Sequence, residues 1–311
     1  MQKIVILGTG GTIAGRAARA DDAVGYRAAE LGVQALIDAV PPLAGWPLEA
    51  EQVAQRDSKD MDIGTWLLLA QRAAHHLARP DVAGVVVTHG TDTLEETAWF
   101  LHRVLAPAKP LVLTAAMRPA TALSADGPQN LFDAVTLAAE PGACGVLAVL
   151  AGQAHGAADL RKVHTIRLEA FSSGDSGPVA LIQSGRVKVL RPWPTGDAVG
   201  LPATPADAWP WVAVVANHAG ADGREVRALV QSGVAGLVVA GTGNGSLSAG
   251  LEAALHAAQS AGVAVRRSSR CAFGPVIDPA DGVGSPIPSA GDRTVWQARV
   301  NLLLELAIRR S

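Results

Sequence analysis

Two segments of the chain combine glycine with hydroxyl and carboxyl side chains. The first runs Gly8-Thr9-Gly10-Gly11-Thr12-Ile13-Ala14-Gly15, and the second runs His89-Gly90-Thr91-Asp92-Thr93. A hydroxyl beside a carboxylate is what an activated nucleophile or a proton relay requires. Closely spaced glycines also let the backbone approach a bound ligand. These two segments are therefore the first candidates for a functional site.

Each segment also has a simpler structural interpretation. Thr93 with Glu96 fits a capping box at the start of a helix, and Asp92 suits a helix start as a carboxylate. One of the two acting as a cap would leave Thr91 and the other acid available for chemistry. The glycine clusters, in turn, are compatible with tight turns between a strand and a helix. Spacing alone leaves both interpretations open.

A nucleotide site is not supported by the glycine clusters. A dinucleotide-binding fingerprint that starts at Gly8 needs glycine or alanine where this chain has Ile13, and a phosphate-binding P-loop needs a lysine that does not follow. The later run, Gly241 to Ser246, fails the fingerprint at Ser246.

The elements that must position the candidate residues are short apolar runs that alternate with helical patterns. Buried strands are expected at 3–8, 84–88, 110–114, 145–150, 212–216, 235–240 and 263–266. Helices are expected at 66–77, 95–105, 131–138, 225–230 and 247–258. This alternation indicates an α/β fold with mostly parallel sheets and flanking helices. Ligands of such sheets bind beyond the carboxyl ends of the strands, where both candidate segments lie.

The length of 311 residues and a proline-rich stretch predict two domains. Residues 191–210 hold five prolines and little apolar periodicity, which is typical of a linker. We therefore expect a larger N-terminal domain at 1–190 and a smaller C-terminal α/β domain at 211–311.

The composition excludes several classes of protein. A hydrophobic fraction of 49% argues against a disordered chain, and a net charge of -2 gives no footprint for nucleic acid or an anionic membrane. Two cysteines cannot build a disulfide framework. The N-terminal apolar run is short and stops at glycines, unlike a signal peptide, and no apolar run approaches the roughly 20 residues of a membrane helix. We expect a cytoplasmic protein that binds neither nucleic acid nor membrane.

Tyr26, Lys162 and one histidine pair are further candidates for functional residues. Tyr26, the only tyrosine, lies in a stretch of small and charged residues at 17–29 that suits a mobile lid, although an exposed aromatic without a role fits as well. Lys162 lies in a polar stretch and by itself resembles a solvated lysine. His75 and His76 are adjacent, so they face different sides of a helix, and no metal site is expected.

Several segments together resemble the bacterial L-asparaginases and glutaminase-asparaginases. The runs at 9–15 and 88–98 match the two signatures of that family, and the matches at 116–119, 124–131, 243–245 and 267–270 follow in its order. The resemblance extends from about residue 4 to about residue 304. It implies a larger N-terminal and a smaller C-terminal α/β domain. It also implies a homotetramer of close dimers, in which the neighbouring subunit completes each site.

The resemblance also implies roles for individual residues. Thr12 would be the nucleophile, activated by Tyr26 on the lid, and Thr91, Asp92 and Lys162 would form a second hydroxyl–carboxylate–amine triad. Ser58 and Asp92 would bind the α-carboxylate and the α-ammonium of the substrate. The full set of expected substrate-binding residues is Gly11, Ser58, Lys59, Thr91, Asp92, Ser246 and Asp281. The family chemistry needs no metal and no organic cofactor.

Three positions depart from the family pattern. Lys59 stands where the family commonly has glutamine, and its charge would weaken binding of a free amino acid unless it points away or pairs with Asp60. Ser246 replaces an asparagine that is common in asparagine-selective members. Asp281 aligns only loosely with the acidic residue that the neighbouring subunit would supply.

The function expected from these observations is hydrolysis of L-asparagine to L-aspartate and ammonia through a threonine acyl-enzyme, with some activity on glutamine. One alternative is an amidase for another side-chain amide or an N-acyl amino acid, with Lys59 binding an anionic group. A second alternative is a catalytically silent amino-acid-binding protein on the same scaffold.

Overall fold

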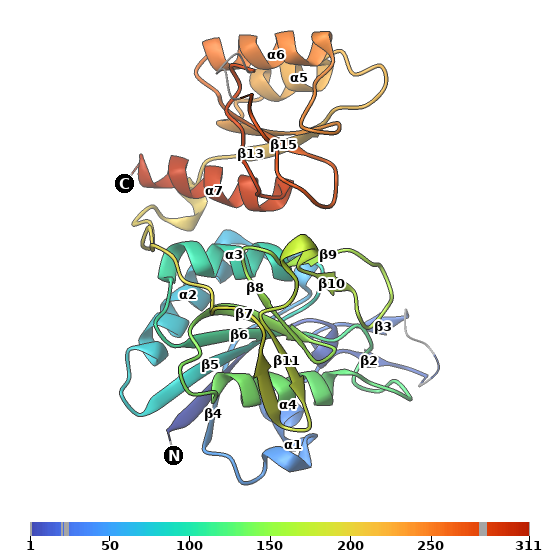
Figure 1. Cartoon of the computed structure of the whole chain (residues 1–311), viewed down its shortest axis with the longest axis vertical. Coiled ribbons are helices and arrows are strands. Elements are labelled where there is room, and N and C mark those ends of the chain that lie inside the picture. Colours follow the sequence, from blue (N-terminus) through green and yellow to red (C-terminus); the bar gives the residue numbers. More distant parts are fainter. Residues whose placement is uncertain (1, 20, 22–24, 280–284, 311) are drawn as a thin grey trace. The chain divides into compact units, whose positions relative to one another are not determined.

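The computed structural model describes residues 2–19, 21, 25–279 and 285–310, and the chain divides into two compact units at 1–201 and 202–311 (Figure 1). The division falls inside the proline-rich stretch at 191–210. Each unit holds a sheet with helices on its two faces, which confirms the predicted α/β class.

The larger unit is built on a mixed sheet whose order is β12-β11-β8-β7-β6-β5-β1-β4. Five neighbouring strands are parallel: β4 (Leu48–Arg56), β1 (Lys3–Gly10), β5 (Val82–Thr88), β6 (Pro110–Thr114) and β7 (Gly145–Leu150). Three antiparallel strands extend the sheet: β8 (Gln153–Gly156), β11 (Ala180–Gln183) and β12 (Arg186–Val189). With five of its eight strands in one parallel block, the sheet is mostly parallel, as the sequence predicts.

Helices cover both faces of this sheet. Helices α2 (Ile63–Leu77) and α3 (Leu94–Leu105) lie on one face, and α1 (Val33–Asp38) and α4 (Gly127–Ala138) lie on the other (Figure 1). Side chains of successive strand residues point to opposite faces. Accordingly, Ile4 and Ile6 of β1 share one apolar cluster with Leu36 and Leu131 from the α1 and α4 face. The central strands are buried on both faces, so each reads as a continuous apolar run.

Short elements complete the larger unit. They are the strand pairs β2 (Arg16–Ala17) with β3 (Tyr26–Arg27) and β9 (Arg161–Lys162) with β10 (Phe171–Ser172), and the 3-10 turns η1 (Thr12–Ala14), η2 (Pro41–Leu43), η3 (Ser58–Asp60) and η4 (Gly174–Ser176). Most of these elements lie in loops that follow the sheet strands, and four of them carry expected site residues: Thr12 on η1, Tyr26 on β3, Ser58 and Lys59 on η3, and Lys162 on β9.

The smaller unit is a three-stranded parallel sheet with helices on two faces. Its strands are β13 (Val212–Ala216), β14 (Gly236–Gly241) and β15 (Ala264–Ser269), and its helices are α5 (Arg224–Gln231), α6 (Ala249–Ser260) and α7 (Val295–Ile308), preceded by η5 (Ala206–Ala208). Val226 of α5 and Leu255 of α6 share one core cluster. Leu302 of α7 packs with Val212 and Val238 in a second.

The structure contains elements that apolar patterning does not reveal. Strand β4 is the edge of its sheet and is only half-buried along most of its length, so it lacks the continuous apolar run of its neighbours. Helix α7 begins at a capping box of Thr294 and Gln297 and is also absent from the predicted elements.

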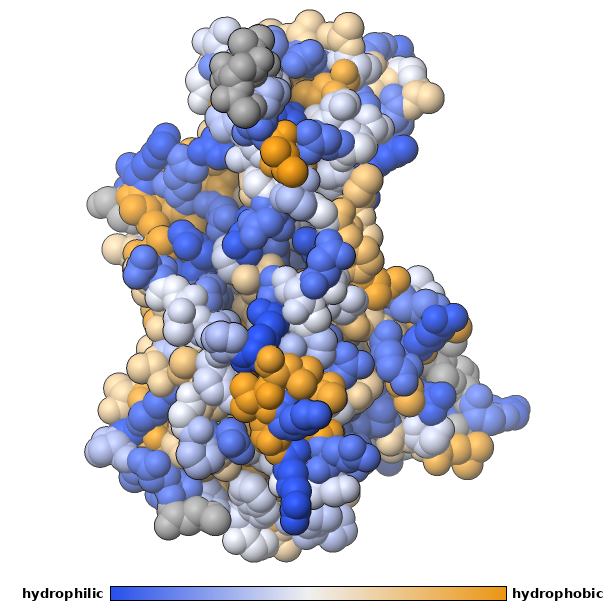
Figure 2. Space-filling view, in the orientation of Figure 1, coloured by the Kyte–Doolittle hydropathy of each residue, from blue (hydrophilic) through white to orange (hydrophobic). Residues whose placement is uncertain are grey.

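The surface mixes hydrophilic and hydrophobic residues. On the face seen in Figure 2, hydrophobic side chains gather in a patch on the larger unit and are surrounded by hydrophilic ones. Among the described residues, no helix has both the length and the apolar character needed to cross a membrane.

Candidate active site

Three neighbouring strand ends bring the candidate residues together. Strand β1 lies between β4 and β5 and is parallel to both, with Gly8 opposite Thr88 and Gly10 opposite Arg56. The carboxyl ends of all three strands therefore lie at one edge of the sheet. The residues that follow them are Ser58 after β4, Thr12 after β1 and Thr91 after β5.

A close approach of two glycines joins two of these strand ends. Gly11 has a φ of 83°, in the left-handed region that favours glycine, and a Cβ atom at this position would overlap the main-chain nitrogen of Gly90. A Cβ atom on Gly90 would in turn overlap the Oγ of Ser58. The glycines thus allow the segments that carry Thr12, Thr91 and Ser58 to touch, which supports close approach rather than simple turn formation.

Thr12 has one hydrogen-bond partner suited to its activation. Its Oγ1 lies 2.6 Å from the phenol oxygen of Tyr26, and either oxygen can be the donor. Thr12 is 7% exposed, so this contact lies at the edge of the buried interior. The structure therefore places the only tyrosine against the expected nucleophile.

The strand pair that carries Tyr26 is hydrogen-bonded to the loop after β6. Tyr26 pairs with Ala17 across β3 and β2. The main-chain N–H of Ala17 donates to Thr121 Oγ1 at 2.8 Å, and the N–H of Ala120 donates to the carbonyl oxygen of Gly15 at 2.9 Å. These bonds tie both ends of the β2 segment to the loop.

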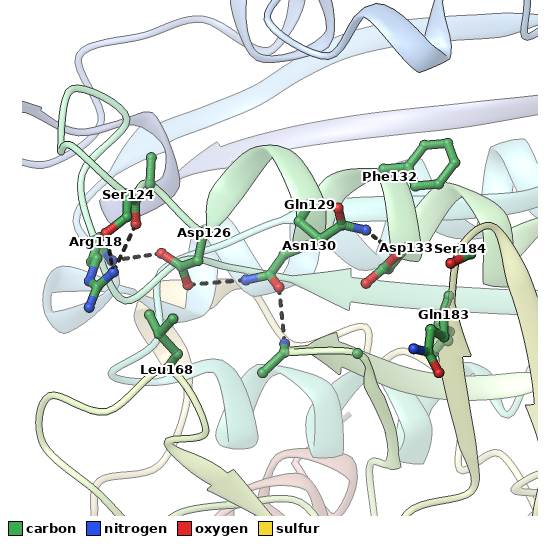
Figure 3. A pocket seen from close by; sticks show the side chains of 14 residues that line it. Arg118, Ser124, Asp126, Gln129, Asn130, Phe132, Asp133, Leu168, Gln183 and Ser184 are labelled. Carbon is green, nitrogen blue, oxygen red and sulfur yellow. Dashed lines mark hydrogen bonds between the residues drawn. The ribbon is translucent and has the colours of Figure 1, made fainter.

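That loop is in turn fixed by Asp126, at the start of α4 (Figure 3). Its carboxylate accepts from the main-chain N–H groups of Met117 and Arg118 at 2.9 and 3.0 Å and from Asn130 Nδ2 at 3.2 Å. These side chains border a cavity of about 640 Å³, which is lined by residues of the loop, of α4 and of the β7–β8 and β11–β12 turns. None of the expected catalytic residues lines this cavity, so it is separate from the candidate site.

Lys162 joins the second pair of expected residues. From β9, its Nζ donates to Thr91 Oγ1 at 2.9 Å and to Asp92 Oδ1 at 2.6 Å. The side chain is 18% exposed. It is therefore not the solvated lysine that its polar surroundings suggest, and the contact spans 71 positions of the sequence.

Ser58 anchors the start of helix α3 from the neighbouring strand end. Its Oγ accepts from the main-chain N–H of Asp92 at 3.2 Å, and its carbonyl oxygen accepts from Thr93 Oγ1 at 2.7 Å. Thr93 is the N-cap residue of α3, but its side chain makes no capping bond to the helix. The capping box considered for Thr93 with Glu96 is therefore wrong, and the Thr93 hydroxyl is turned toward the carbonyl oxygen of Ser58.

The charge of Lys59 is offset by a neighbouring acid. Its Nζ forms an ion pair with Asp57 and lies 4.0 Å from Asp60. The Asp57 carboxylate raises the pKa of Lys59. The sequence suggests Asp60 as the partner, but in the structure Asp57 is the main partner and Asp60 is the more distant one.

Two buried titratable residues next to Thr91 were not among the predicted site residues. Burial raises the pKa of Glu95 to about 7, and its Oε2 accepts from the main-chain N–H of Lys162 at 3.3 Å. Burial lowers the pKa of His89 to about 4, so its ring is neutral near pH 7. Both lie inside the second signature segment. The sequence feature that could have revealed them is a polar residue at a position that faces the interior.

His89 belongs to a hydrogen-bonded chain behind the site. Its Nδ1 lies 2.7 Å from the carbonyl oxygen of Gly90, which can only accept, so the proton is on Nδ1. Its Nε2 then accepts from Thr97 Oγ1 at 3.0 Å, and Thr97 accepts from Trp66 Nε1 at 2.8 Å. This chain fixes the backbone just before Thr91.

Two expected substrate-binding residues belong to the smaller unit. Ser246 is an exposed residue of the smaller unit, next to a cavity of about 260 Å³ that is also lined by Asn244 and the buried Arg267. Asp281 lies outside the described residues. Within the described part of the chain, no three or more His, Cys, Asp or Glu side chains gather in a way that could hold a metal ion.

Comparison with known proteins decides the family. Residues 3–195 match the family model "Asparaginase, N-terminal", and residues 211–311 match "Glutaminase/Asparaginase C-terminal domain". This chain belongs to the asparaginase family. The predicted resemblance is thereby confirmed over nearly the whole length of the chain.

Individual asparaginases are similar along most of their length. L-asparaginase 2 of Escherichia coli is 36% identical over 319 residues, which cover 100% of this chain and 90% of that protein. The glutaminase-asparaginase of Pseudomonas fluorescens biotype A is 37% identical over 283 residues, covering 86% and 75%. The structure of a probable cytoplasmic L-asparaginase from Campylobacter jejuni has a TM-score of 0.88 and 35% identity, covering 100% and 96%.

Proposed function

We propose that this chain hydrolyses the side-chain amide of L-asparagine to L-aspartate and ammonia through an acyl-enzyme on Thr12, with some activity on L-glutamine. The observation that carries the proposal is a pair of hydroxyls on adjoining strand ends, each with its own proton partner. Thr12 is bonded to Tyr26, and Thr91 is bonded to Lys162. The names of the similar L-asparaginase and glutaminase-asparaginase proteins support the substrate class.

In the first step, Thr12 Oγ1 attacks the side-chain carbonyl carbon of the substrate. The hydroxyl proton moves toward the phenol oxygen of Tyr26, which lies 2.6 Å away. The tetrahedral intermediate then collapses: the carbon–nitrogen bond breaks as the leaving nitrogen takes up, by way of Tyr26, the proton that Thr12 gave up, and ammonia departs. An ester between Thr12 and the acyl group remains.

In the second step, water attacks this ester and releases the acid. We assign Thr91 and Lys162 to the transfer of the water proton, because a lysine in a partly desolvated site can act as a base toward a neighbouring hydroxyl. Asp92 holds the lysine amine at 2.6 Å and so keeps it beside Thr91. The proton returns to Thr12 Oγ1 as its bond to the acyl carbon breaks, which restores the enzyme.

The α-carboxylate and the α-ammonium of the substrate are assigned to Ser58 and Asp92. Gly11, whose bare backbone packs against Gly90 beside Thr12, remains a proposed contact of the bound amino acid, as do Ser246 and Asp281. Lys59 is paired with Asp57, so its ammonium is not a ready partner for an extra anionic group on the substrate. This pairing favours a free amino acid over the N-acylated substrate considered above.

The test is a panel of amides assayed for ammonia release. We expect turnover of L-asparagine and slower, measurable turnover of L-glutamine, because one methylene changes binding by only about 1–3 kcal/mol in a pocket of this kind. Hydrolysis of N-acyl amino acids alone would support the amidase alternative. Binding of aspartate without ammonia release from any amide would support the silent binding protein.

We further propose that the chain assembles as a homotetramer of close dimers and acts in the cytoplasm. Exposed apolar side chains such as Trp211, Ile277 and Trp296 are available for subunit contacts. The compartment is supported by the name of the C. jejuni protein. Light scattering coupled to size exclusion tests the assembly, and fractionation of the native host into cytoplasm and periplasm tests the location.

A further inference from the structure

Glu95 is a buried carboxyl group directly beside the proposed catalytic residues. It lies in the first turn of α3, four positions after Thr91, and is 8% exposed. Its Oε2 accepts a hydrogen bond from the main-chain N–H of Lys162 at 3.3 Å. Glu95 and Lys162 are 67 positions apart in the sequence, so this bond links α3 to β9.

The local strand pairing explains why Lys162 needs this partner. Lys162 lies opposite Phe171 in the antiparallel pair of β9 and β10. The next residue, Val163, directs its N–H toward β10 and donates to the carbonyl oxygen of Ala170 at 2.8 Å. Because N–H groups alternate in direction along a strand, the N–H of Lys162 points away from β10. Glu95 supplies the acceptor on that side, as a buried donor requires.

We propose that Glu95 is a positioning residue for Lys162. By binding the main-chain N–H of Lys162, it fixes the strand from which the amine reaches Thr91 and Asp92. All three contacts of Lys162 then come from the start of one helix: Thr91 and Asp92 just before α3, and Glu95 within its first turn. The effect on turnover rests on the proposed function, whereas the anchoring of Lys162 does not.

The charge of Glu95 changes within the neutral pH range. Burial raises its pKa to about 7, and Glu96 on the same helix acts in the same direction. Arg161 and Lys162 on β9 oppose the rise. A neutral carboxyl group still has an oxygen that can accept the N–H, but an ionised one accepts it more strongly. The anchor is therefore expected to tighten as Glu95 loses its proton.

Two substitutions separate the acceptor from the charge. Glu95→Gln keeps an acceptor oxygen and removes the charge, while Glu95→Met keeps a similar length and removes the acceptor. With L-asparagine, we expect the wild type to show a kcat inflection near pH 7, with kcat falling on the acid side. Glu95→Gln should lack this inflection and stay within about fivefold of the wild-type kcat at pH 8. Glu95→Met should lose about 30-fold or more in kcat, with KM within about threefold, as expected for a misplaced catalytic group.

Asp133 provides a matched control within the same unit. It is a buried carboxyl group on α4, bonded to Gln129 at 2.8 Å, and burial raises its pKa to about 6. Helix α4 lies on the other face of the sheet from α3 (Figure 1). Asp133→Asn and Asp133→Leu should change thermal stability while leaving kcat and its pH profile within twofold of the wild type.

Amide hydrogen exchange tests the anchor without any assay of turnover. The peptide that contains Lys162 should exchange about tenfold faster in Glu95→Met and at the wild-type rate in Glu95→Gln. If the wild type releases no ammonia, the proposed function fails, and exchange alone decides the role of Glu95. An unchanged exchange rate in Glu95→Met would overturn the inference. A Glu95→Met variant that keeps the wild-type kcat and the inflection near pH 7 would overturn it as well. If Glu95→Met does not fold, an inflection that persists in Glu95→Gln overturns it.

Discussion

Thr12 and Thr91 are nearly buried, at 7% and 5% exposure, yet both follow strand ends and belong to no apolar core cluster. We therefore expect Thr12→Ala and Thr91→Val to fold normally, with a change in Tm of only a few degrees. Each should lower kcat for L-asparagine by several orders of magnitude, because each removes a hydroxyl from the proposed proton path. Ammonia release and thermal melting measure the two effects. A Thr12→Ala variant with near-normal turnover would show that another residue is the nucleophile.

Lys59 stands where the family commonly has glutamine, and the neighbouring Asp57 offsets the added positive charge. Because Asp57 pairs with its ammonium, we expect Lys59→Gln to change KM for L-asparagine by less than about twofold. Asp57→Asn leaves Lys59 without its main partner and should raise KM, since the free charge then repels the α-ammonium of the substrate. The double variant should return KM to near the wild-type value. A large fall in KM for Lys59→Gln alone would mean that the lysine faces the substrate in spite of Asp57.

At the scale of elements, the site depends on where neighbouring strands end. The parallel pairing of β4, β1 and β5 brings three loops to one edge, and the bare backbones of Gly11 and Gly90 let two of them touch. Larger residues at these glycines would push the loops apart. The segment that follows β5 then contributes Thr91 and Asp92 just before α3 and Glu95 within its first turn.

The segment at 15–29 is predicted to act as a lid that carries Tyr26. Its small and charged side chains offer little apolar surface for packing, so its local stability should be low. Residues 20 and 22–24 of this segment lie outside the described residues. Limited proteolysis with trypsin should cut at Arg16, Arg19 or Arg27 in the free protein and should be slowed by L-aspartate. Thr121→Val removes the side-chain partner of Ala17 and should speed the cleavage. Equal cleavage with and without L-aspartate would count against a lid.

At the scale of the whole molecule, buried titratable groups set opposing pH dependences of stability. The raised pKa values of Glu95, about 7, and Asp133, about 6, favour the folded state at low pH. That contribution is complete below about pH 4 and is lost as pH rises through 6 to 7. The lowered pKa values of His89 and His155, both about 4, do the reverse. Their contribution is complete above about pH 6.5 and is lost as pH falls toward 4.

One substitution separates these opposing pH dependences of stability. The Tm of Asp133→Asn minus that of the wild type should increase as pH rises from 4.5 to 8, because only the wild type must then bury a charge at this position. The corresponding gain in free energy of unfolding is on the order of 1–3 kcal/mol, from about 1.4 kcal/mol per unit of pKa shift. Calorimetry at both pH values measures it. A difference in Tm that does not change with pH would mean that the pKa of Asp133 is the same in the folded and the unfolded protein.

Much of this protein follows from local sequence. The central strands at 110–114 and 145–150 have the bounds that their apolar runs predict, because strands buried on both faces need apolar residues at every position. The family signatures are contiguous runs, so the family and the residue types of the site are also visible without coordinates. Half-buried elements such as β4 are not, since their alternating polar residues resemble those of a loop or a surface helix.

Tertiary structure decided the contacts between segments that are distant in the chain. Composition and spacing do not distinguish Lys162 from a solvated lysine, and its burial beside Thr91 arises only when β9 packs against α3. Thr93 has the sequence of a helix cap but makes no capping bond, and its hydroxyl donates to the carbonyl oxygen of Ser58, beyond the end of β4. Glu95 acquires its raised pKa only from burial in the folded unit. Hydrogen bonds and desolvation depend on which atoms meet in space, and sequence separation carries no information about that.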